Sequence, residues 1–155
     1  MTAIDRKKRR FTLIELLVVI GIIGILAAIL LPVISAARYN AQKVNAKETA
    51  DKLANAVQRY LNDYGKLPKA DDGMDSNDVI IDAALLDILN RGNSRKLLYY
   101  PNTGSVKNVW GGHFYISMDG DYDGQLNADG QSVNGSVAVY TKHKAERMSS
   151  WEPKN

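Results

Sequence analysis

The sequence predicts an α+β fold in which a long N-terminal helix, its first half transmembrane, packs on a small antiparallel β-sheet. Three observations predict it. Residues 11–31 are almost wholly apolar, residues 43–64 repeat apolar positions every three or four residues, and two later segments alternate apolar and polar side chains. The chain has 155 residues, which leaves room for one small domain after the helix.

The first element is the apolar run over residues 11–31, which directly follows the basic cluster of residues 6–10. About 20 apolar residues are enough to cross a bilayer as a helix. Lys and Arg beside a first membrane helix hold that side in the cytoplasm, so we expect the chain beyond Leu31 to face outward. A cleavable secretory signal is the alternative, but its apolar core is shorter and its cleavage site lies at the far end.

The helix is expected to continue to Tyr64, because its second half is amphipathic and Gly is absent between Val33 and Tyr64. Pro32 is expected to kink it, since proline cannot donate to the helical ladder. Gly65 and Pro68 predict its end. The predicted buried stripe comprises Ala46, Ala50, Leu53, Val57, Leu61 and Tyr64.

The rest of the chain is expected to form one short helix and two or three antiparallel strands. Residues 79–90 are predicted to be the helix, and residues 113–118 and 136–141 are the best strands. The acidic stretch of residues 71–78 is expected to be a solvated loop that caps this helix rather than a metal site.

One string within the N-terminal segment carries a family resemblance. Residues 10–20, Arg-Phe-Thr-Leu-Ile-Glu-Leu-Leu-Val-Val-Ile, resemble the class III signal of type IV pilins and of the pseudopilins of type II secretion. The resemblance implies that a prepilin peptidase cleaves between Arg10 and Phe11, that Phe11 is then N-methylated, and that Glu15 is needed for assembly. Arg10 stands where the family almost always has Gly.

Two further strings point to the major pseudopilin within that family. Tyr64-Gly65-x-x-Pro68 resembles the segment after the long helix, and Trp110-Gly111 resembles part of an Asp-Pro-Trp-Gly element. The implied organisation is a cytoplasmic leader at residues 1–10, a transmembrane and filament-core helix at residues 11–31, and an amphipathic helix with a small globular domain at residues 32–155.

The resemblance also implies function and location. It implies a structural subunit of a helical homo-oligomeric pseudopilus that drives protein export, working with inner-membrane secretion machinery. The chain is then a single-pass protein of the bacterial inner membrane, with a cytoplasmic N-terminus and a periplasmic C-terminal domain. The alternatives are a surface type IV pilus subunit for adhesion, motility or DNA uptake, and a membrane-anchored calcium-binding module that never polymerises.

Glu15 is the only charged residue within the apolar run, and a carboxylate inside a membrane helix is costly enough that it normally has a function. In a bundle of parallel helices, the free amine of Phe11 on a neighbouring subunit would supply the cation that it needs. That pairing would set the axial stagger of a filament. Alternatively, Glu15 is protonated or reaches water at the cytoplasmic interface.

A second motif predicts a calcium site. Asp119, Asp121 and Asp123 alternate, and Gly124 occupies the sixth position, as in the first half of an EF-hand loop. The twelfth position is Gly130 rather than an acid, so further ligands are expected from another loop, from the backbone oxygen of Gln125, or from Asn127 or Asp129. The resemblance to major pseudopilins also implies structural calcium here. The alternative is an Asp-Gly hairpin turn, which favours the same residues.

Composition argues against other classes of protein. There is no Cys, so neither a disulfide nor a thiol nucleophile is possible. We expect no catalytic residues, because the two His residues lack nearby orienting acids and no phosphate loop, Ser elbow or zinc spacing occurs. Nucleic-acid binding is not expected, because the net charge of +3 is explained by the basic N-terminus and residues 142–144.

Overall fold

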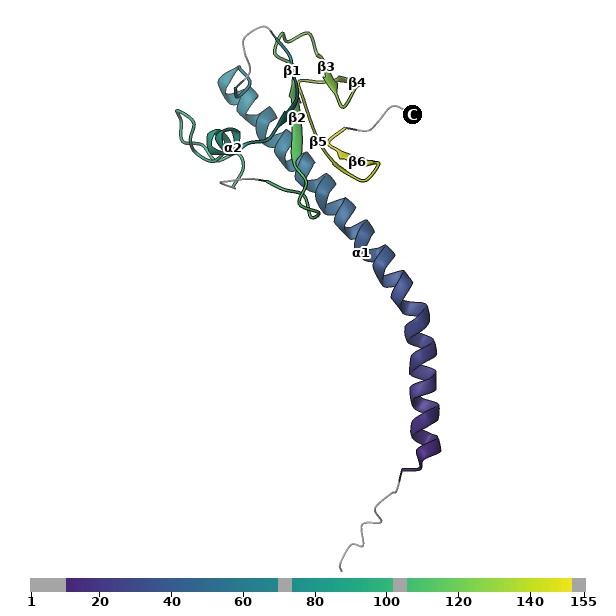
Figure 1. Ribbon diagram of the computed structural model, residues 1–155. Coiled ribbons are helices and arrows are strands. Elements are labelled where there is room, and N and C mark those ends of the chain that lie inside the picture. The colour runs from purple at the N-terminus through teal and green to yellow at the C-terminus, as the bar shows by residue number, and fades with distance from the viewer. Residues whose placement is uncertain (1–10, 70–73, 102–105, 152–155) are drawn as a thin grey trace, which may run out of the picture. The chain divides into compact units, whose positions relative to one another are not determined.

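The computed structural model describes residues 11–69, 74–101 and 106–151 (Figure 1). The chain divides into two compact units, Met1–Asn40 and Ala41–Asn155, and each is described by itself. The proposed leader at residues 1–10, including Arg10, lies outside the described residues. One helix, α1 at Leu13–Tyr64, runs through both units.

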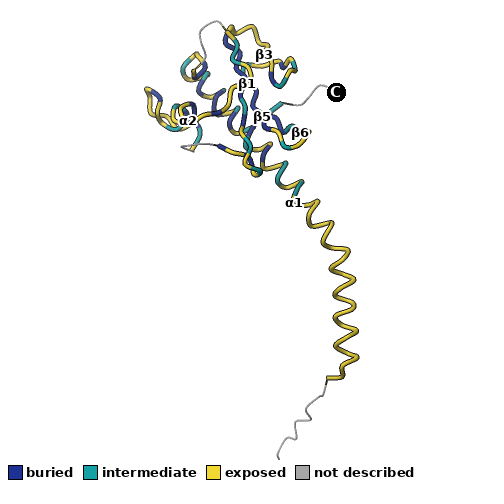
Figure 2. The backbone as a smooth tube through the Cα atoms, in the orientation of Figure 1, coloured by how far each residue is buried: buried dark blue, intermediate teal, exposed yellow. Residues whose placement is uncertain are grey.

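In the first unit, α1 makes no tertiary contacts that bury it. Every residue from position 11 to position 38 is exposed, which Figure 2 shows as an unbroken stretch of yellow. By length and composition, α1 is the one helix of the described residues able to cross a membrane. The helix continues through Pro32, and the hydroxyl of Ser35 donates to the carbonyl oxygens of Leu31 and Pro32, both at 3.0 Å. The kink at Pro32 stays a prediction.

In the second unit, α1 buries one face, as the sequence periodicity predicts. Leu61 and Tyr64 are only partly buried. The helix ends at Gly65, whose φ of 68° is one that glycine adopts without strain and whose N–H donates to the Leu61 carbonyl oxygen at 2.7 Å. The buried residues of α1 are Ala46, Ala50, Leu53, Ala56, Val57 and Tyr60.

A four-stranded antiparallel sheet has the order β1-β2-β5-β6. Its strands are β1 (Ser76–Ile80), β2 (Phe114–Met118), β5 (Val137–His143) and β6 (Glu146–Ser149). Strands β3 (Gln125–Ala128) and β4 (Gln131–Asn134) form a separate hairpin. The α+β class is confirmed, and the two strands expected from alternation correspond to β2 and β5.

Two expectations about the intervening segment are wrong. Val79 and Ile80 belong to edge strand β1, where they pair with Ile116 and Tyr115, instead of starting a helix. Helix α2 is shorter, at Ala83–Leu89. Pairing with β2 provides hydrogen-bond partners for the backbone N–H and C=O groups of β1. The local sequence pattern cannot predict this pairing, because β2 lies far away along the chain.

The cap of α2 also differs from expectation. The carboxylate of Asp82, not a side chain of residues 76–78, accepts the Leu85 N–H at 2.8 Å. Lys69 contacts the same carboxylate at 2.8 Å and is the largest cause that lowers the pKa of Asp82. This contact ties the segment after α1 to the start of α2.

The two faces of the sheet are buried by different partners. Val139 and Ile116 belong to the main core, which also contains Leu53 of α1 and Leu86 of α2. On the other face of β5, Ala138 packs with Leu126, Ala128 and Val133 of the β3–β4 hairpin, and Trp151 borders that cluster. Successive side chains of β5 therefore pack into two different cores. The β3–β4 hairpin covers the face of the sheet that points away from α1 and α2.

Candidate functional site

The first candidate site is the start of α1. The carboxylate of Glu15 accepts hydrogen bonds from the backbone N–H and the hydroxyl of Thr12, both at 2.8 Å. In return, the Thr12 hydroxyl oxygen accepts the Glu15 N–H at 3.3 Å. This reciprocal arrangement is a capping box, which satisfies backbone donors that the first helical turn leaves free.

The apolar surroundings of Glu15 are also defined. It lies on one helical face with Phe11, Ile14, Val18 and Val19, and these residues line a shallow hollow of about 380 Å³. Phe11 is 81% exposed and Ile14 is 71% exposed. The carboxylate therefore stands on an apolar face that another helix or lipid must cover. The Thr-x-x-Glu spacing is the signal that would have predicted the capping box from the sequence.

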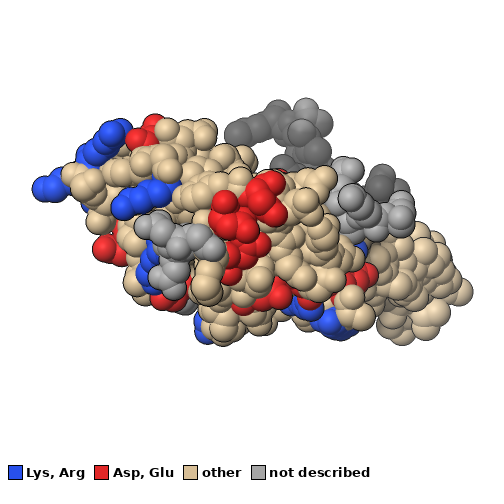
Figure 3. All heavy atoms as spheres, turned by 90° about the horizontal axis from the view of Figure 1, so that it is seen from above, with Lys and Arg blue, Asp and Glu red and all other residues tan. Residues whose placement is uncertain are grey.

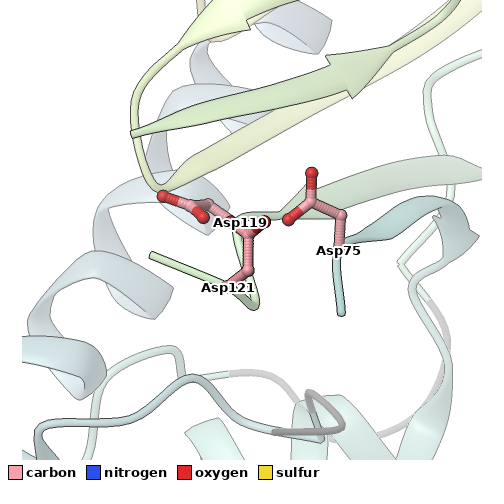
Figure 4. A group of neighbouring side chains, drawn as sticks. All are labelled: Asp75, Asp119 and Asp121. Carbon is pink, nitrogen blue, oxygen red and sulfur yellow. The ribbon is translucent and has the colours of Figure 1, made fainter. Parts of the chain in front are cut away.

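The second candidate site is a group of three acids. Asp75, Asp119 and Asp121 each offer a carboxylate oxygen, and these oxygens lie within 4.8 Å of one another (Figure 4). Asp119 and Asp121 follow β2, and Asp75 directly precedes β1. In the described parts of the chain, this is the one group of three or more Asp, Glu, His or Cys side chains whose atoms lie close enough together to hold a metal ion.

Asp119 is the most constrained member of this group. It is 1% exposed, and its Oδ2 accepts the N–H of Gly124 at 2.9 Å. Its Oδ1 is buried and has no hydrogen-bond partner. A buried carboxylate oxygen without a donor is energetically unfavourable, so this is the oxygen of the group that a bound cation or water would satisfy.

The neighbouring acids organise the loop itself. Asp75 Oδ1 accepts the Gly120 N–H at 3.1 Å, which joins the segment before β1 to the loop after β2. Asp121 Oδ1 accepts the N–H of Asp123 at 3.1 Å, and Asp123 Oδ1 accepts that of Gln125 at 2.7 Å. Asp121 and Asp123 are exposed, so their remaining oxygens face solvent.

Not all predicted ligands join the group. Asn127 lies exposed within β3 and pairs with Ser132 across the hairpin. The carboxylate of Asp129 forms ion pairs with Lys142 and, at 3.1 Å, with Arg147. The Asp129 carboxylate is therefore paired with two cations and does not join the acidic group, although the loop pattern suggests it as a calcium ligand.

Asp75 is the site residue that sequence reasoning missed. The composition of the stretch containing it predicts loop and cap, and nothing in the chain between it and Asp119 shows that the two meet. The pairing of β1 with β2, which matches Ser76 to Met118, brings them together. Asp71 and Asp72 of the same stretch lie outside the described residues.

Comparison with known proteins bears on the start of α1 and on the family of the chain. Residues 6–31 match the model of the prokaryotic N-terminal methylation motif. The chain is 30% identical over 156 residues to type II secretion system core protein G of Escherichia coli (strain K12), covering 92% of this chain and 100% of that protein. It is 25% identical over 134 residues to the protein of the same name from Klebsiella michiganensis, covering 84% and 87%.

A shorter similarity joins the chain to a pilin. It is 42% identical over 62 residues to type IV major pilin protein PilE1 of Neisseria gonorrhoeae, covering 40% of this chain and 38% of that protein. No solved structure matches the chain significantly.

Proposed function

Because the chain belongs to the family of type II secretion system core protein G, we propose that it is the structural subunit of a pseudopilus that drives protein export. The methylation motif at residues 6–31 supports processing by prepilin peptidase between Arg10 and Phe11, followed by N-methylation of Phe11. Methylation of a terminal amine keeps it basic, so Phe11 retains a positive charge after processing. The chain has no catalytic role in this function.

The proposal rests on one observation: an acid, Glu15, lies on the exposed, apolar first part of α1. Residues 11–38 are exposed in the single chain, although most of their side chains are apolar through Ile34. Burial of apolar surface is favourable by roughly 25 cal/mol per Å², so this surface needs lipid or neighbouring helices around it. A filament core of parallel helices provides such neighbours once the subunit leaves the membrane.

Glu15 gives that core its register. In the single chain its carboxylate is held by Thr12. In the filament, the ammonium group of a neighbouring Phe11 provides a full opposite charge in apolar surroundings, where the attraction between two charges is much stronger than in water and an unpaired carboxylate is costly. The pairing fixes the axial offset between successive subunits, because it forms only when one helix start lies beside the next subunit's Glu15.

The subunit is proposed to enter the filament from the bacterial inner membrane. The basic cluster of residues 6–10 holds the N-terminus in the cytoplasm, and the single apolar helix crosses once. The unit formed by Ala41–Asn155 then faces the periplasm. Its partners are further copies of itself, the prepilin peptidase and the inner-membrane secretion machinery.

A structural calcium ion is proposed for the second unit. Carboxylate oxygens are the ligands that calcium prefers, and the buried Asp119 Oδ1 is an acceptor without a donor. Asp75, Asp119 and Asp121 would hold the ion, with Asp123 and the backbone oxygen of Gln125 as additional ligands. The ion would supply positive charge that ties the loop after β2 to the start of β1, with no chemistry on a substrate.

The test of the filament proposal replaces Glu15 in cells that carry their own secretion machinery. Glu15→Leu and Glu15→Gln are expected to abolish filaments seen by electron microscopy, while the subunit still fractionates with the inner membrane. Mass spectrometry of the wild-type subunit should find a chain that begins at methylated Phe11. Normal filaments from Glu15→Leu, or a mature chain that begins at Met1, would overturn the proposal.

A surface type IV pilus subunit is the second candidate function, because 62 residues match a major pilin at 42% identity. That match covers 40% of the chain, against 92% for core protein G. Deleting the gene separates the two functions. Loss of protein export supports the pseudopilus, whereas loss of surface filaments with export intact supports the pilus.

A further inference from the structure

A groove on the second unit lies between α1 and β6, the edge strand of the sheet. It has a volume of about 280 Å³. Its floor includes Met148, which is 5% exposed, while Val44 on its α1 side is 58% exposed. Its lining includes Lys43, Val44, Lys47, Arg147, Met148 and Trp151.

The groove is positively charged. Three of its lining residues are cations, and no carboxylate lines it. Lys43 pairs with Glu146 at 2.7 Å, and Arg147 pairs with Asp129 at 3.1 Å. Lys47 is exposed and forms no ion pair with any residue that the structure describes. A charge thus remains for an acidic partner.

Trp151 adds a flat apolar wall. Its ring lies under the Arg147 guanidinium, with 5.1 Å from the guanidinium carbon to the ring centroid. Its Nε1 is buried and has no acceptor among the residues 11–69, 74–101 and 106–151. Trp and Arg are enriched at the centres of protein interfaces, so this wall is suited to contact with another protein surface.

The acidic group lies on a different surface of the same unit, beyond the end of β2. Strand β2 ends at Met118, opposite Val137, where β5 begins, and the loop of Asp119, Asp121 and Asp123 follows it. Strand β6 begins at Glu146, opposite His143, where β5 ends. Figure 1 shows these two ends of β5, and Figure 3, seen from the end that carries the acidic loop, shows Asp and Glu side chains gathered in one patch.

Two different complementary patches on one folded unit can meet only between two copies, in a heterologous contact. Such a heterologous contact builds a helical filament when the rotation between copies does not close a ring. We infer that the Lys43–Lys47 groove binds the acidic loop after β2 of a second copy of this chain. This inference rests on the proposed function, because the filament core holds copies close enough for the contact to form.

Calcium and this contact are compatible. A divalent ion offsets two of the four negative charges of Asp75, Asp119, Asp121 and Asp123, so the loop keeps a net negative charge. Asp121 and Asp123 are exposed and face a partner, whereas Asp119 is buried. An ordered loop also loses less conformational freedom on binding than a flexible one.

Disulfide cross-linking tests the contact, because the chain contains no native Cys. The test pair is Val44→Cys with Gln125→Cys. Val44 lines the groove without contributing charge, and the exposed Gln125 side chain lies at the end of the acidic loop. Oxidising assembled filaments should give dimers and longer ladders on a non-reducing gel. The matched control is Asn45→Cys with Gln125→Cys, since Asn45 is exposed one position along α1 but does not line the groove.

Charge reversal supplies a second measurement. Adding Lys47→Glu to the test pair should reduce cross-linking at least tenfold, whereas Lys52→Glu, on an exposed part of α1 outside this groove, should leave it unchanged. Filaments without ladders, equal ladders from the control pair, or a disulfide only within single chains would overturn the inference. If the wild-type chain, which has no Cys, forms no filaments, the proposed function is wrong and so is this contact.

Discussion

Asp119 and Gly124 are joined across one tight loop, with the Gly124 N–H donating to Asp119 Oδ2 at 2.9 Å, and this bond leaves Oδ1 of the same carboxylate buried without a donor. One oxygen of Asp119 therefore closes the loop, and the same carboxylate belongs to the acidic group with Asp75 and Asp121. A cation would compensate such an atom.

Asp119→Ala should remove the effect of calcium on stability. For the wild-type chain in detergent, calcium at 100 times its Kd should add about 2.7 kcal/mol, which raises Tm by roughly 10 °C for a domain of this size. Thermal unfolding with calcium and with chelator measures the difference. Asp51→Asn, on α1 away from the loop, should retain the wild-type response. A wild-type Tm that chelator does not change would remove the calcium proposal.

Thr12→Ala separates the two interactions of Glu15. Losing the N-terminal cap should cost about 1 kcal/mol, so amides in the first turn of α1 should exchange hydrogen faster. The Glu15 carboxylate remains available to a neighbouring Phe11, so filaments should still form. If Thr12→Ala stops assembly as completely as Glu15→Leu, then the capping box, and not pairing between subunits, accounts for the importance of Glu15.

Tyr99 should make the second unit sensitive to alkali. Burial raises the pKa of Tyr99 to about 12, and the hydrogen bond to Asp63, at 2.7 Å, adds to this effect. In the unfolded chain the pKa is about 10. Between these values only the unfolded state loses the proton, so the free energy of unfolding should fall as pH rises from about 10 to about 12.

Tyr99→Phe checks this assignment. The variant loses the hydrogen bond to Asp63, which should cost about 1 kcal/mol at neutral pH. It should also lose part of the alkaline dependence, measured by denaturant unfolding at a series of pH values. An unchanged slope of stability against pH in the variant would show that other groups dominate in this range.

Leu53→Ala tests the packing of α1 on the sheet. Leu53 is 1% exposed in the main core, so the substitution should lower the free energy of unfolding by about 2–5 kcal/mol. Val109→Ala, at a position that is 45% exposed, should change it by no more than about 0.5 kcal/mol. Equal effects of the two substitutions would contradict the core as described.

The features that could be predicted from the sequence are those set by local patterns. The apolar run, the stripe that contains Leu53 and the end of α1 at Gly65 each depend on neighbours within a few positions. Glu15 could be singled out because one charge in an apolar run is visible without any structure. The strands β2 and β5 were found for the same reason, since alternation is a local signal.

Only the tertiary structure decided which distant residues meet. Strand pairing, not local preference, places Val79 in β1 and brings Asp75 beside Asp119. Asp129 follows the loop pattern of a ligand, yet Arg147 and Lys142 approach it from other strands and satisfy its charge. Periodicity reports which face of an element is buried, but it contains no information about the partner that buries it, because that partner is chosen by packing over the whole domain.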